Sequence, residues 1–248
     1  MMKKIFLLLL ILSSVIAGNA QTEKETAKPP KKFDLSKRTA DHFMIQYGLD
    51  NWLGKPDSIV TKGFSRHFNV YVMLDKPFKN NPKFSVGVGV GISSSNMFFD
   101  KRYINVKSTS TLLPFNRSYS GADSSYFNKF KLVTVFLEAP IELRYYANPE
   151  NPNASWKGAI GIKVGTLLKA YTKGKDLANK AGQSIYGNKY IQKESEKRFF
   201  NSTRLALSAR VGYGIFGLHF SYQITEVIKE GLGPEVRPLS IGLTISGL

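Results

Sequence analysis

Two glutamates, Glu138 and Glu142, lie four residues apart in an alternating apolar segment, and they are the first candidates for chemistry in this chain. Paired carboxylates act as general acid and general base when both reach the same bond. The alternation predicts a β-strand, along which a spacing of four residues separates the two side chains by about 13 Å. That separation is too large for a dyad, so we expect no acid–base catalysis from this pair.

Residue types that support other site chemistry are scarce. The chain has no cysteine, which excludes disulfides and thiol chemistry, and its three histidines are spread along the sequence rather than grouped as metal ligands. The glycines of segment 86–92 do not form a phosphate-binding loop, because no helix is predicted after them. We therefore predict no catalytic residue, no metal site and no cofactor.

The elements that must position the polar residues are strands. Residues 83–93 alternate strictly, with apolar side chains on one face and serine and glycine on the other. Side chains alternate faces along a strand, so this segment is a strand with one apolar face and one small, polar face. The same pattern predicts eight strands, near residues 42–50, 66–74, 83–93, 130–146, 156–171, 204–213, 217–225 and 238–246.

The connections between these strands alternate in length. The longer ones are 51–65, 94–129, 172–203 and 226–237, and the shorter ones are 75–82, 147–155 and 214–216. Outer-membrane barrels show this asymmetry, with short turns on the periplasmic side and long loops outside. An even number of strands then places both termini on the periplasmic side.

The N-terminal segment is typical of an export signal. Lys3 and Lys4 precede an apolar run from Ile5 to Leu12, and small residues follow up to Ala20. This three-part order predicts a secretory signal peptide over 1–20, since the apolar run is too short to span a bilayer as a helix. Residues 21–40 are polar and basic and are interpreted as a flexible periplasmic leader, which leaves 41–248 as the barrel domain.

Membrane insertion is the interpretation that the pattern favours. Because backbone polar groups in lipid must be bonded internally, an exported chain without a spanning helix can cross a membrane only as a closed barrel. A soluble, lipocalin-like barrel has the same alternation with its apolar face inward. Aromatic residues near the strand ends, and charges among glycines on the second face, favour the membrane form. The predicted fold is therefore all-β, an eight-stranded antiparallel up-and-down transmembrane β-barrel with its apolar face outward.

The inward face then holds charges of both signs. Buried charges are costly unless paired, and an eight-stranded barrel is only wide enough for its own side chains. We expect a structural salt-bridge cluster in the lumen, formed by Glu138, Glu142, Arg144, Lys163, Lys169, Arg204 and Arg210. A substrate site in the same place is the alternative that this pattern leaves open.

The pair His219 and Ser221 is a candidate catalytic site, because some lipid A deacylases of the outer membrane carry a His-x-Ser pair. The predicted strand turns both side chains into the lumen, away from lipid. A nucleophile also needs a base that a third group orients. We therefore predict no lipid-modifying activity from this pair.

The net charge of +17 points to anionic partners. Export makes nucleic acid an unsuitable partner, whereas phosphate-bearing lipid is the anion that an exported barrel meets. Basic residues of the predicted long loops are therefore candidates for contact with lipopolysaccharide, and solvation alone is the alternative: Lys101, Arg102, Lys107, Arg117, Lys173 and Lys175.

Three segments resemble the PorT-like family of bacterial outer-membrane β-barrels: VFLEAPIELRYY at 135–146, WKGAIGIKVGTLLKAYTKGK at 156–175, and the final LSIGLTISGL. The resemblance spans most of residues 40–248. It implies an integral outer-membrane barrel of about eight strands, and a few members of that family assist a secretion system.

The expected function is a structural or interaction role in the outer membrane, in envelope integrity or in support of protein secretion. The expected partners are outer-membrane lipid, lipopolysaccharide and secretion or envelope proteins. A small-solute channel is the alternative function, and a lipid-modifying enzyme is the third.

Overall fold

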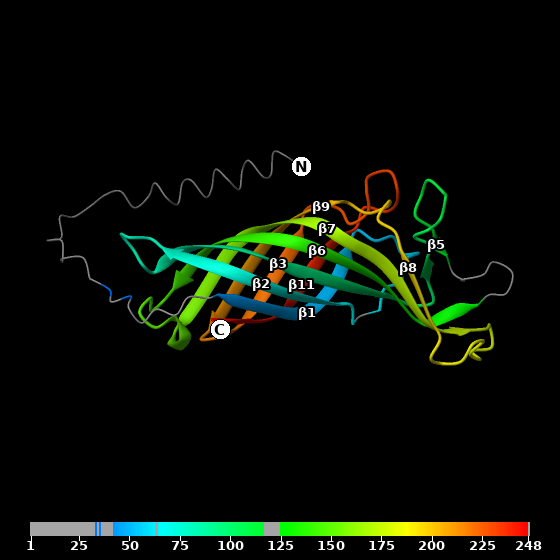
Figure 1. Cartoon of the computed structure of the whole chain (residues 1–248), viewed down its shortest axis with the longest axis horizontal. Helices are drawn as coiled ribbons and strands as arrows, with labels where there is room; N and C mark the ends of the chain where they lie inside the picture. Colours follow the sequence, from blue (N-terminus) through cyan, green and yellow to red (C-terminus); the bar gives the residue numbers. More distant parts are fainter. Residues whose placement is uncertain (1–32, 34, 36–41, 63, 117–124, 248) are drawn as a thin grey trace. The chain divides into compact units, whose positions relative to one another are not determined.

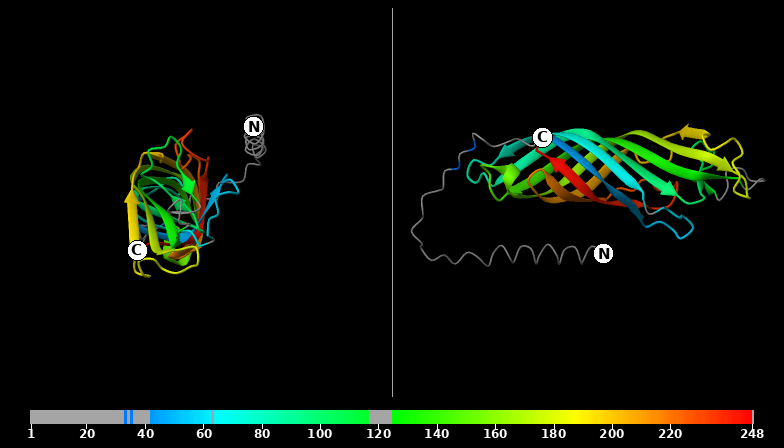
Figure 2. Two further views of the ribbon diagram at one scale, coloured as in Figure 1. Left: turned by 90° about the vertical axis from the view of Figure 1, so that its right-hand side faces the viewer. Right: turned by 90° about the horizontal axis from the view of Figure 1, so that it is seen from below.

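The computed structural model of the chain describes residues 33, 35, 42–62, 64–116 and 125–247. Within these ranges, eight strands close into a ring in which each strand pairs antiparallel with its neighbours in sequence, and β1 pairs with β11 to close the ring. Figure 1 shows the strands winding obliquely, and the end-on view in Figure 2 shows the ring. The eight-stranded up-and-down barrel predicted from the alternation is confirmed.

The ring strands follow the predicted segments closely, with the largest extensions in β3, β6 and β7. Their bounds are β1 (Phe43–Leu53), β2 (Arg66–Pro77), β3 (Phe84–Phe99), β6 (Tyr126–Tyr146), β7 (Trp156–Ala178), β9 (Thr203–Tyr213), β10 (Phe216–Gln223) and β11 (Arg237–Ser246). The remaining elements are β4 (Tyr103–Ile104), β5 (Phe115–Asn116), β8 (Ile191–Ser195) and the 3-10 turn η1 (Pro152–Ala154). Within the described ranges, no helix has the length and apolarity needed to cross a bilayer.

The two ends of the barrel differ. Short turns join β2 to β3, β6 to β7 and β9 to β10 at one end, which we call the short-turn end, and Phe43 and Ser246 lie at this end too. Long connections leave the other, long-loop end, where β6 and β7 extend past the ring and β8 pairs with β7 (Figure 1). The expected signal peptide lies outside the described residues, and so does nearly all of the expected leader.

The apolar face of each strand points outward, as predicted for a membrane barrel. Exposed side chains alternate with buried ones along β1, β2, β6, β9 and β11. The outward positions are leucine, isoleucine, valine and aromatic residues, such as Ile160, which is 64% exposed. Aromatic pairs Phe84–Tyr145 and Trp156–Tyr213 lie on this face near the short-turn end, as in an interfacial girdle.

A β-bulge interrupts the pairing of β6 with β7. Val135 pairs with Lys169 and Phe136 pairs with Leu167, so Leu168 is an extra residue in β7. One extra residue exchanges the faces of the residues that follow. Beyond the bulge, Lys169 and Lys173 lie on the outer face of β7, while Ala170 and Thr172 are buried inside.

Candidate functional site

The inward face of the barrel holds a connected polar network, and Glu142 of β6 lies at one of its centres. Its carboxylate accepts hydrogen bonds from Arg210 Nη2 at 2.6 Å and from Arg144 Nε at 3.0 Å. All three side chains are more than nine-tenths buried. A carboxylate held by two guanidinium groups is fully satisfied, so this centre is a structural ion cluster rather than a free acid.

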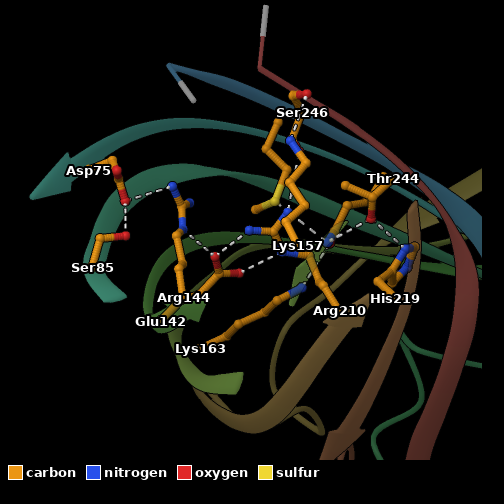
Figure 3. Close-up of polar contacts among 12 residues, drawn as sticks. Asp75, Ser85, Glu142, Arg144, Lys157, Lys163, Arg210, His219, Thr244 and Ser246 are labelled. Carbon is orange, nitrogen blue, oxygen red and sulfur yellow. Dashed lines mark hydrogen bonds and ion pairs between the residues drawn. The ribbon is translucent and has the colours of Figure 1, made fainter. Parts of the chain in front are cut away.

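Arg144 connects this centre to the short-turn end. Its Nη1 lies 3.4 Å from Asp75 Oδ1, and Asp75 also accepts a hydrogen bond from Ser85 at 2.5 Å (Figure 3). The guanidinium lies over Gly87 of β3, where a Cβ would come within 2.6 Å of Arg144 Cζ. The glycine face of β3 therefore provides room for the long side chain of Arg144.

Glu138 is the second centre. It accepts hydrogen bonds from Arg204 Nη1 at 2.8 Å and from Tyr71 Oη at 2.6 Å. Lys163 contacts the same tyrosine hydroxyl at 3.3 Å and donates to Gln46 Oε1 at 2.9 Å. Arg204 of β9 and Tyr71 of β2 thus hold an acid from β6, and Lys163 of β7 contacts Gln46 of β1 on the opposite side of the ring.

A chain of imidazole contacts continues the network toward the long-loop end. His67 Nδ1 lies 2.7 Å from Asp50 Oδ1, and His67 Nε2 lies 2.7 Å from His219 Nε2. His219 Nδ1 lies 3.0 Å from Thr244 Oγ1. Sequence reasoning did not single out His67 and Asp50, although the parity of their strands turns both inward and was sufficient to find them.

The interior leaves little free space. A cavity of about 20 Å³ is lined by residues such as Arg144, Lys157, Arg210 and Ser246, and another of about 10 Å³ lies between Trp52, Met97 and Arg204. Each has room for roughly one water molecule. Neither forms a path along the lumen.

Apolar residues close the long-loop end. All four long connections contribute buried side chains that pack against the inner faces of β1, β3, β6 and β7, and we call this cluster the apolar cap. Its members include Trp52, Ile59, Phe99, Ile104, Phe130, Phe136, Phe199, Phe200 and Ile228. For these connections, the sequence predicted contact of their basic residues with lipopolysaccharide, or solvation alone. Their isolated apolar residues, such as the pair Phe199–Phe200, were the signal that this prediction missed.

Comparison with known proteins agrees with this geometry. The family model described as "Outer membrane protein beta-barrel domain" matches residues 20–229. The chain belongs to this outer-membrane β-barrel family. It is an outer-membrane barrel protein. A comparison with curated proteins finds no match.

Two solved structures are remotely similar to this outer-membrane barrel. One is Ail, the attachment invasion locus protein of Yersinia pestis, in complex with the heparin analogue sucrose octasulfate, with 14% identity and a TM-score of 0.34. The other is Ail alone, with 15% identity and a TM-score of 0.30. Each alignment covers 82% of this chain and 94% of Ail.

The prediction was wrong for one residue of the lumen cluster. Lys169 was expected inside, but the bulge at Leu168 turns it to the outer face of the barrel, where its Nζ lies 5.9 Å from the centre of the Tyr171 ring. The other six predicted residues face inward. They are Glu138, Glu142, Arg144, Lys163, Arg204 and Arg210.

The predicted loop cations have mixed positions. Lys101 is exposed in a connection and lies over the Tyr126 ring, and Lys107 is exposed as well. Arg102 is half-buried, and Arg117 lies outside the described residues. The placement of Lys173 and Lys175 in a loop was wrong, because β7 continues to Ala178 and both lysines lie on its outer face.

The His219–Ser221 pair has no catalytic arrangement. Both residues are buried on the inward face, and the ring nitrogens of His219 contact His67 and Thr244 rather than Ser221. Among the described residues, no group of three or more histidines, aspartates or glutamates is arranged to hold a metal ion.

Proposed function

We propose that this outer-membrane barrel has a structural and interaction role in the envelope, without catalysis or solute transport. The barrel supports the long connections at its long-loop end, and these connections meet lipid and partner proteins. The packed interior of the described part of the barrel is the observation on which this proposal rests. The ion clusters fill the middle of the barrel, and the apolar cap fills its long-loop end.

The proposed orientation places the long-loop end outside the cell and both termini in the periplasm. Short turns on the periplasmic side are the rule for such barrels. The chain has no cysteine, so single cysteines can report the orientation. We expect Lys180→Cys, in a long connection, to react with an impermeant maleimide on intact cells, and Lys79→Cys, in a short turn, to react only after lysis. The reverse labelling would contradict the orientation.

Conductance across planar bilayers tests the closed lumen. The purified barrel is expected to give no steady conductance under conditions in which a porin of known conductance does. Stable single-channel steps would overturn the proposal and favour the small-solute channel. Release of fatty acid from lipid A by the purified protein would favour a lipid-modifying enzyme instead.

A deletion strain tests the role in the envelope. We expect it to become sensitive to detergents and large antibiotics, and the full-length gene should restore resistance. The PorT-like segments at 135–146 and 156–175 favour a narrower role in assisting protein secretion. Loss of particular surface proteins from the deletion strain, with an otherwise intact barrier, would support that narrower role.

A further inference from the structure

Five lysines form two adjacent cross-strand rows on the outer face of the extension made by β6, β7 and β8. We call these rows the lysine ladder: Lys129, Lys131, Lys173, Lys175 and Lys193. Lys129 pairs directly with Lys175, and Lys131 pairs with Lys173, which in turn pairs with Lys193. Side chains directly opposite on neighbouring strands begin about 5 Å apart, and like charges at that separation repel. The bare ladder is therefore an unfavourable arrangement that a bound anion would relieve.

Most of the charge of the ladder has no carboxylate beside it among the described residues, and Asp176 attracts Lys175 without forming an ion pair with it. Within those ranges, none of its lysines lies within ion-pair distance of an acid. Asp176 lies beside Lys175 but accepts hydrogen bonds from Ser184 and Asn128. Glu194 lies beside Lys193 but accepts hydrogen bonds from Tyr103 and Gln192.

Neighbouring aromatic rings hold the ladder at the barrel wall. Lys193 Nζ lies 4.2 Å from the centre of the Tyr171 ring, and Lys131 Nζ lies 5.5 Å from the Phe98 ring. Arg66 lies over that same Phe98 ring at 5.6 Å. Partial burial, and then the charges of Lys173 and Arg66, lower the pKa of Lys131, which lies beyond the apolar band. Cations are thus crowded around this part of the wall.

The height of the ladder points to lipid headgroups. The outer face of β7 is largely apolar from Trp156 to Leu168. At the rise and tilt of a barrel strand, this stretch covers about 30 Å, the thickness of the hydrocarbon layer. Lys169, Lys173 and Lys175 follow directly, so their side chains point sideways toward the headgroup layer rather than up from the loop tips.

We propose that the lysine ladder binds the phosphate groups of the glycolipid in the outer leaflet, such as those of lipid A. This inference rests on the proposed orientation, with the long-loop end outside. Lysine ammonium groups beside aromatic rings suit phosphate at a membrane interface. The lateral placement favours a membrane lipid over a soluble polyanion, which would bind the upward-facing loops.

Binding of lipid A by the full-length barrel in zwitterionic detergent micelles tests the proposal. The test variant is Lys131→Gln with Lys173→Gln, and the matched control is Lys197→Gln with Lys229→Gln, which removes two exposed loop lysines. We expect the ladder variant to bind bisphosphorylated lipid A roughly 30-fold more weakly than wild type. The control variant should bind as wild type does, and dephosphorylated lipid A should bind all three proteins equally weakly.

Folding of each variant is checked by heat-modifiable gel mobility. Without lipid, the ladder variant should resist heat about as well as wild type, because the substitution removes like-charge repulsion together with the hydrogen bond from Lys131 Nζ to Asn96 Oδ1. With lipid A, only wild type and the control should gain resistance. Equal lipid A binding by the ladder variant would overturn the proposal, and so would a preference for inositol hexakisphosphate over lipid A. Cysteine labelling tests the orientation separately, so failure of the orientation and failure of the ladder are distinguishable.

Discussion

His67 and His219 meet edge to face inside the barrel, with their Nε2 atoms 2.7 Å apart. They come from strands that are not neighbours, because β1 and β11 lie between β2 and β10. The residues between them in the same cross-strand row are Gly48 and Gly242. Two positions without side chains therefore allow two imidazoles to meet across the inner wall.

One tautomer assignment satisfies every contact in this chain of groups. His67 Nδ1–H donates to Asp50, and His219 Nε2–H donates to His67 Nε2. Thr244 Oγ1–H donates to His219 Nδ1, and Thr244 Oγ1 accepts from Gln46 Nε2 at 3.4 Å. Two protonated rings would place two donors against each other, so at least one of the two imidazoles accepts at Nε2. In this assignment, the donor and acceptor roles of each group are set by the group next to it.

Gly48 and Gly242, which lie between the two histidines, give a first prediction. A Cβ at residue 242 would overlap the Tyr47 carbonyl oxygen and lie 2.8 Å from His219 Cε1. Backbone atoms of a paired strand cannot move aside easily, so we expect Gly242→Ala to lower the free energy of unfolding by about 3 kcal/mol. Gly158→Ala is the matched control, because its Cβ would meet only Arg210 O at 3.7 Å. Urea unfolding in detergent measures both, and equal stability of the two variants would contradict the steric argument.

Asp50 gives a second prediction. Its buried carboxylate accepts hydrogen bonds from His67, from Ser240 at 2.6 Å and from Ser95. Asp50→Ala leaves those donors unpaired in the interior, which we expect to cost about 3 kcal/mol of unfolding free energy. Asp57→Ala, at an exposed position, should change stability by less than about 0.5 kcal/mol. A fully stable Asp50→Ala barrel would show that water replaces the carboxylate.

Glu142 gives a third prediction. Its removal leaves Arg210 and Arg144 without their shared acid, and breaking a buried ion pair from one side costs about 3–5 kcal/mol. Glu142→Ala should therefore unfold at lower temperature in detergent, whereas Glu230→Ala, at an exposed position, should not. Adding Arg210→Ala to Glu142→Ala should restore part of the loss. Additive losses in this double-mutant cycle would mean that the two side chains are not coupled.

The bulge at Leu168 gives a fourth prediction, which compares two lysines of β7. Lys163 points inward and contacts Tyr71 and Gln46, while Lys169 points outward. We expect Lys163→Ala to lower unfolding free energy by about 2 kcal/mol and Lys169→Ala to change it by less than about 0.5 kcal/mol. Thermal midpoints in detergent distinguish the two. Equal losses would place Lys169 inside and argue against the bulge.

Asp176 gives a prediction about pH at the long-loop end, beyond the apolar band. Hydrogen bonds from Ser184 and Asn128 hold the pKa of Asp176 below its usual value of 3.8. Because the folded pKa is lowered, the contribution of Asp176 to the local fold is present above the usual value and is lost as pH falls through the lowered one. Exchange protection of the Ile185 amide, which donates to Leu177 O at 2.8 Å, should therefore fall in acid.

Asp176→Asn is the control for that measurement. Asn tolerates the positive φ of 60° at this position as Asp does. The variant has no carboxylate to titrate, so its exchange protection, corrected for the intrinsic rate, should not change over the same pH range. An identical pH dependence in both proteins would assign the change to another group.

The alternating pattern by itself determined the strands and their faces. Once the ring closes, outward apolar residues such as Leu137, Ile141 and Leu143 can be buried only in lipid. Because side chains alternate with a period of two, this requirement fixes which face of each strand points outward. The inward parity of Glu138 and Glu142 followed from the same rule. Local sequence therefore predicted the barrel, the number of strands, and six of the seven inward charges.

The tertiary structure alone decided which inward residues meet. The partners of Arg144, His67 and Asp50 depend on the shear of the ring and on glycines in neighbouring strands, which no single segment encodes. The bulge at Leu168 arises from pairing with β6, so the parity of β7 could not place Lys169. The apolar cap likewise forms only when four distant connections converge, because its buried residues, such as Ile59, Ile104 and Ile228, come from segments far apart in the chain.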